Sequence, residues 1–159
     1  MREREDKRTL RWMFNMIVVN LVELSSESSR GLTLPTLYLF VIHLGGGIQE
    51  LSILISIFSV GRLVGSTLFG KMTDLMSARE TYISSILISL LGNFIYILAD
   101  MNGVSPSTGM LILMMSRFIV GFGAGNRSVC RSNVADLTVP ESRMRYMTLL
   151  QATVYFGYA

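Results

Sequence analysis

The apolar residues of this 159-residue chain form long blocks that are separated by short polar segments. The blocks cover about 12–44, 51–69, 81–99 and 108–135, and a further block runs from 144 to 159. As a helix that rises about 1.5 Å per residue, each of the first four can cross a hydrocarbon core of about 30 Å. The pattern predicts an all-α transmembrane fold, with four complete helices and the start of a fifth (12–159) after a mixed-charge tail (1–11).

The composition favours a membrane protein over a soluble one. Half of the residues are hydrophobic and only 16% are charged, whereas soluble domains have about 25% charged residues. We therefore expect an integral, multi-pass protein whose partner is the lipid bilayer. One cysteine, Cys130, and one histidine, His43, offer no metal constellation, and no nucleophile–base pair is recognisable. We expect no catalytic residue, no metal and no cofactor.

Basic residues outside the blocks predict the orientation. Lysines and arginines occur in the tail, between the second and third blocks, and after the fourth block, but not in the loops 45–50 and 100–108. The positive-inside rule then places the amino terminus in the cytoplasm. Because acidic residues interrupt the basic tail, the net charge of +3 reflects topology and gives no support to nucleic-acid binding.

Six ionisable side chains lie inside the apolar blocks. Each would cost about 2.5 to 3.5 kcal/mol at a bilayer centre, so such residues pair with one another or line a water-filled path. We predict that they form a substrate or proton pathway: Glu23, Glu27, Arg30, Arg62, Arg117 and Arg127.

The helical period groups these charges. Glu23, Glu27 and Arg30 fall within about 60° of one another and form a polar stripe on the first helix. A local ion-pair ladder is one interpretation, and a stripe with a carboxylate free to bind a proton is the other. Arg117 and Arg127 share a face of the fourth helix, whereas the third block carries no charge and can face lipid.

Glycines in the second and fourth blocks predict close helix packing. They recur at a spacing that lets neighbouring backbones approach each other. The residues are Gly61, Gly65, Gly121, Gly123 and Gly125.

The segment 70–79, Gly-Lys-Met-Thr-Asp-Leu-Met-Ser-Ala-Arg, resembles the cytoplasmic loop motif of the major facilitator superfamily. Asp74 and Arg79 match that motif, whereas Leu75, Ser77 and Ala78 replace its usual basic residue, glycine and arginine.

The rest of the chain extends the resemblance. Arg117 followed by alternating glycines, and Asp136 with Pro140 and Arg143, are similar to the family's fourth helix and the loop after it. The runs 85–89 and 120–132 resemble the lysosomal branch linked to ceroid lipofuscinosis and its vacuolar relatives.

The resemblance implies the first part of a six-helix half of a transporter that has two such halves. Its first and fourth helices would line a cavity, and its third would be peripheral. It also implies a cytoplasmic gating cluster of Gly70, Asp74, Arg79, Asp136 and Arg143 in an alternating-access cycle. Topology and helix capping are the simpler roles for these residues. The membrane would be lysosomal, vacuolar or plasma membrane.

The leading hypothesis is a fragment of a secondary transporter for a small polar or anionic solute, with proton coupling as an open question. Four arginines against two glutamates favour an anion. The remaining helices would then be partners of this chain. The rival hypothesis is a truncated, non-transporting membrane protein that associates with a full-length protomer through its glycine faces. An oligomeric channel is a third hypothesis.

Overall fold

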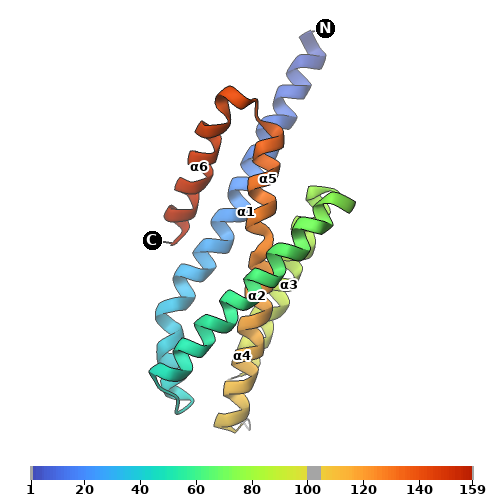
Figure 1. Cartoon of the computed structure of the whole chain (residues 1–159). Coiled ribbons are helices and arrows are strands. Elements are labelled where there is room, and N and C mark those ends of the chain that lie inside the picture. Colours follow the sequence, from blue (N-terminus) through green and yellow to red (C-terminus); the bar gives the residue numbers. More distant parts are fainter. Residues whose placement is uncertain (1, 100–104, 159) are drawn as a thin grey trace. The chain divides into compact units, whose positions relative to one another are not determined.

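The computed structural model describes residues 2–99 and 105–158, with side chains from Leu10 onward. Every regular element in these ranges is helical (Figure 1), which confirms the all-α prediction. The helices are α1 (Arg2–His43), α2 (Ile48–Leu75), α3 (Ala78–Leu98), α4 (Pro106–Gly123), the 3₁₀ turn η1 (Ala124–Asn126), α5 (Arg127–Leu137) and α6 (Pro140–Tyr158). Most of the arginine-free loop 100–108 lies outside the described residues, as do Met1, Ala159 and the side chains of residues 2–9.

Helix ends differ from the predicted blocks because polar caps, rather than apolar residues, determine where helices begin. Ser77 accepts a hydrogen bond from the Glu80 amide at the start of α3, and Ser105 accepts one from the Thr108 amide at the start of α4. α1 begins at Arg2, so the residues of the tail are helical as well.

The predicted fourth helix is divided in the structure. α4 ends at Gly123, the 3₁₀ turn η1 follows, and α5 begins at Arg127. The division falls among Gly121, Gly123 and Gly125, and the low helix propensity of glycine contributes to it. Three stretches are long and apolar enough to cross a membrane: Ile48–Leu75, Ala78–Leu98 and Pro106–Leu137. α1 is long enough but is not among these apolar stretches, because its polar stripe interrupts the apolar sequence.

The chain divides into two compact units. Unit 1 contains α1 up to Leu32, α5 from Cys130, and α6; unit 2 contains residues 33–129.

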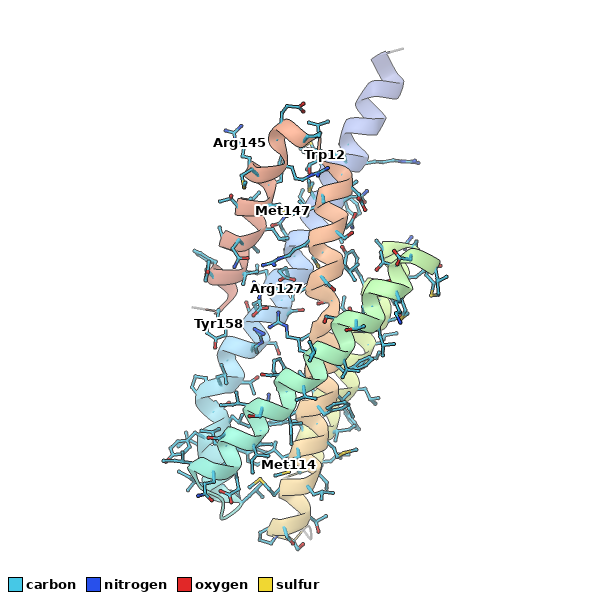
Figure 2. The ribbon with its side chains drawn as sticks, in the orientation of Figure 1. Trp12, Met114, Arg127, Arg145, Met147 and Tyr158 are labelled. Carbon is cyan, nitrogen blue, oxygen red and sulfur yellow. The ribbon has the colours of Figure 1, made fainter. Side chains whose placement is uncertain are left out.

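In unit 1, α1 and α6 run in the same direction (Figure 1), and two contacts set their register. The Trp12 ring meets the Tyr146 ring edge-on with centroids 5.3 Å apart. About two turns further along, Thr153 Oγ1 donates a 3.0 Å hydrogen bond to Asn20 Oδ1. Trp12 Nε1 also donates to the Leu137 carbonyl of α5 at 2.7 Å, and Figure 2 shows its side chain near the start of α6. Unit 1 is therefore connected by polar and aromatic side chains.

In unit 2, α4 packs against both α2 and α3. A cluster of buried apolar side chains fills the space near one end of these helices: Leu37, Val41, Leu54, Ala99 and Leu113. Exposed apolar residues follow the helical period along α3, and they form a face suited to lipid: Ile83, Ile86, Leu87, Leu90, Leu91, Phe94 and Ile97.

Candidate functional site

The α1 polar stripe is buried. Glu23 is 1% exposed and Glu27 is 3% exposed. Arg30 lies about one turn after Glu27, and its Nη1 atom donates a hydrogen bond of 2.6 Å to Glu27 Oε2. The structure thus brings Glu27 and Arg30 together as an ion pair, with Glu23 one turn before them on the same face.

α6 covers this stripe at its carboxyl end. A Cβ atom added to Gly157 would lie 3.0 Å from the Leu24 carbonyl oxygen and 3.2 Å from Glu27 Cβ. A Cβ atom added to Gly31 would lie 2.9 Å from the Tyr158 carbonyl oxygen. Two glycines, one on each helix, therefore permit the backbones to approach beside the Glu27–Arg30 pair.

Arg117 is buried in unit 2, at 6% exposure, and it contacts α3. Its Cζ atom lies 4.7 Å from the centroid of the Tyr96 ring, in cation–π geometry. Among the residues that the structure describes, no carboxylate forms an ion pair with Arg117, and its Nε atom has no hydrogen-bond acceptor. The side chain is therefore a buried cation stabilised by an aromatic face.

Two further polar contacts join α3 to the α4–η1 segment. Ser116 Oγ donates to the Gly92 carbonyl at 3.0 Å, and Asn126 Nδ2 donates to Ser85 Oγ at 3.0 Å. The sequence predicted no site role for Tyr96, Ser85, Ser116 or Asn126, although Ser85 and Asn126 lie in the runs that resemble the lysosomal branch. Their spacing offers a signal in retrospect: Ser85, Gly92 and Tyr96 recur at the helical period on one face of the uncharged helix.

The other two predicted pathway residues are half-buried. Arg62 lies on α2 directly after Gly61, and Arg127 is the first residue of α5. Both belong to unit 2. Their membership of a common pathway with the α1 stripe stays a prediction.

The predicted gating residues lie at helix ends. Asp74 and Arg79 flank the turn between α2 and α3 and are exposed, and no ion pair joins them in the described structure. Asp136 and Arg143 are exposed residues of unit 1, on α5 and α6. Gly70 is half-buried, and a Cβ atom added there would meet nothing within 4 Å. The gating role of this group stays a prediction.

The glycines selected from the sequence lie where helices cross. On the α2–α4 pair, a Cβ atom on Gly61 or Gly65 would collide with the backbone of Phe118 or Phe122. From the opposite side, Gly121 faces the Phe58 backbone, and Gly125 faces Gly65 and Ser66. Gly123 faces the Ser85 backbone of α3 instead. The glycines of the α4–η1 segment thus permit close packing against two helices, α2 and α3.

The described side chains hold no group of three or more His, Cys, Asp or Glu residues that could bind a metal ion. The polar chemistry of the site consists of guanidinium, carboxylate, hydroxyl and amide groups.

Comparison with known proteins identifies relatives. A 104-residue segment is 33% identical to "Major facilitator superfamily domain-containing protein 8" of Xenopus laevis, covering 65% of this chain and 20% of the relative. A 106-residue segment is 27% identical to "Putative niacin/nicotinamide transporter NiaP" of Bacillus subtilis (strain 168), covering 65% of this chain and 24% of the relative. The chain therefore spans about a fifth to a quarter of the relatives it matches. No solved structure matches it significantly.

The family model described as "Major Facilitator Superfamily" matches residues 19–159. This range includes the α1 stripe, Arg117 and the glycine crossings. Together with three apolar stretches long enough to span a bilayer, this match shows an integral membrane protein. By this match over most of its length, the chain belongs to the Major Facilitator Superfamily.

Proposed function

We propose that this chain forms part of the solute pathway of a membrane transporter, which moves a small anionic solute by alternating access. Transport, rather than catalysis, is the activity that the family match supports. The amino terminus is cytoplasmic in this proposal, as the basic residues predict. Further transporter helices act as partners of this chain in the proposal and complete the pathway.

Arg117 carries the proposal. A buried guanidinium without a carboxylate partner is costly, and a solute carboxylate would compensate its charge. Tyr96 presents an aromatic face to the same guanidinium, which offsets part of the cost of its burial. The name of the Bacillus subtilis relative refers to niacin, an aromatic carboxylate, and this agrees with such chemistry.

The α1 stripe has a second role in the proposal. Glu27 is paired with Arg30, and Glu23 adds another buried carboxylate on the same face. Protonation of a carboxylate at this depth would couple proton movement to solute movement.

The association of a short chain with a full-length protomer is less well supported. That hypothesis needs free glycine faces, but Gly61, Gly65, Gly121 and Gly125 already face backbone atoms inside unit 2. Their occupancy argues against a second protomer at the same surface.

Uptake by the full-length protein that contains this chain, reconstituted in lipid vesicles, tests the proposal. Nicotinate is the anionic probe, and nicotinamide is a neutral probe of nearly the same shape. Arg117→Ala should abolish nicotinate uptake without reducing membrane insertion, whereas Arg145→Ala, at an exposed position of α6, serves as a charge-matched control. Unchanged nicotinate uptake in Arg117→Ala would overturn the role of Arg117, and preference for nicotinamide would overturn the anionic solute class.

A further inference from the structure

The Glu27–Arg30 pair lies at a weak point of α1. Pro35 has no amide hydrogen, so the Gly31 carbonyl cannot receive the usual intrahelical bond from the residue four positions later. Gly31 itself has a low helix propensity. The helix that holds a buried ion pair is therefore poorly stabilised by its own backbone immediately after that pair.

α6 supports α1 at this point. The carboxyl-terminal turn of α6 contacts α1 at Leu24, Glu27 and Gly31. The contact is close because Gly157 has no side chain; even a methyl group would need the Leu24 carbonyl, at 3.0 Å, or Glu27 Cβ, at 3.2 Å, to shift. Glu27, through its Cβ atom, is the acidic residue of the stripe that contributes one of the three atoms nearest to this methyl group.

The register of the two helices is set elsewhere. The Trp12–Tyr146 and Asn20–Thr153 contacts lie one or more turns from Gly157 and do not involve it. A substitution at Gly157 would therefore leave these contacts in place and act on the end of the helix pair.

We propose that Gly157 is a positioning residue for Glu27, because its lack of a side chain lets α6 approach α1 beside Glu27 and keep the carboxylate in its ion pair with Arg30. The effect on transport rests on the proposed function. The placement of the Glu27 carboxylate is independent of the proposed function, and it can be measured without a solute.

The experiment is carbodiimide modification of the full-length protein in vesicles, with mass spectrometry to measure adducts on Glu27 and Glu23 separately. Carbodiimides react with carboxyl groups that are protonated and accessible, so ion pairing and burial both slow the reaction. Gly157→Leu should accelerate modification of Glu27 about tenfold through local opening, with little change at Glu23. Gly157→Ala should give a smaller acceleration, and it remains informative if the leucine variant does not fold.

Two glycine variants serve as controls. Gly70→Leu adds a side chain where nothing lies within 4 Å, and Gly61→Ala disturbs a helix crossing in unit 2. Neither should change the ratio of Glu27 to Glu23 modification. An unchanged ratio in both Gly157 variants, or an equal rise at both carboxylates, would overturn the proposal.

A cycle of substitutions connects the placement to transport. If Gly157 acts through Glu27, Gly157→Ala should lower nicotinate uptake in the native background and add nothing in a Glu27→Gln background. Additive losses would contradict action through Glu27. If native protein transports neither nicotinate nor nicotinamide, the proposed solute class fails while the modification result still decides the role of Gly157.

Discussion

Unit 2 and unit 1 join their helices by different means. In unit 2, α2 and α4 cross through glycines that face backbone atoms, and the rings of Phe69 and Phe122 meet edge-on between the same two helices. In unit 1, indole, amide, hydroxyl and guanidinium groups connect α1, α5 and α6, including the Arg131–Gln151 hydrogen bond of 2.8 Å. Since lipid tails give apolar helices no hydrophobic reason to associate, close packing and hydrogen bonds are the two available means, and each unit relies mainly on one.

This contrast in packing suits the two units to different roles. Close backbone packing leaves little freedom, so unit 2 is suited to a fixed scaffold. Side-chain hydrogen bonds can be exchanged with water or with other polar groups at modest cost, so unit 1 is suited to changes of charge and contact.

The largest effect should come from Gly121→Leu. Its side chain would collide with the Phe58 backbone, and overpacking of this kind costs about 3 kcal/mol or more. SDS titration of the protein in mixed micelles should show a much earlier unfolding midpoint. Gly70→Leu, placed in open space, should unfold like the native protein. Equal stability of the two variants would mean that glycine crossings do not hold unit 2 together.

Glu27→Ala should have the next largest effect. It removes the anion of a buried pair, which costs about 2 kcal/mol here because Arg30 retains some exposure and can be hydrated. The same titration measures the loss. Glu141→Ala, at an exposed position in the first turn of α6, is the matched control, and a comparable loss there would argue against a special role of the pair.

Trp12→Phe isolates one hydrogen bond of unit 1. The ring contact with Tyr146 can persist, whereas the indole bond to the Leu137 carbonyl is lost, at about 1 kcal/mol. Tryptophan-free variants can be followed by circular dichroism during thermal unfolding. A loss as large as that of Trp12→Ala would indicate that ring packing contributes nothing.

Ser116→Ala should have the smallest effect, about 0.6 kcal/mol, because interhelical hydrogen bonds in membranes are weak on average. It removes the bond to the Gly92 carbonyl in unit 2. Ser52→Ala, whose hydroxyl donates within its own helix, is the comparison. If Ser116→Ala lowered the free energy of unfolding more than Trp12→Phe does, the contrast between the units would be reversed.

Much of the fold follows from local sequence. Apolar blocks predicted the helices, and the serines at 77 and 105 are typical caps that refine their beginnings. The division of the fourth block at Ala124–Asn126 was not predicted, although three glycines precede or interrupt it. Helix propensity alone cannot decide this, because glycines in membrane helices also serve close packing.

The candidate site was predictable only in part. The stripe of Glu23, Glu27 and Arg30 depends on the helical period, which a sequence displays directly. The contact of Arg117 with Tyr96 depends on which face of α4 meets α3, and that is decided by Gly92, Ser116 and Gly123 acting together. A single sequence contains no record of such pairings between helices.

The contact between Glu27 and Gly157 also has a consequence in time. Gly157 follows Glu27 by 130 residues, so at synthesis rates of about 5 to 20 residues per second the ribosome needs roughly 6 to 26 s to produce it. During that interval the Glu27–Arg30 pair is made without the turn of α6 that later covers it. The order of synthesis therefore places the charged helix before its cover.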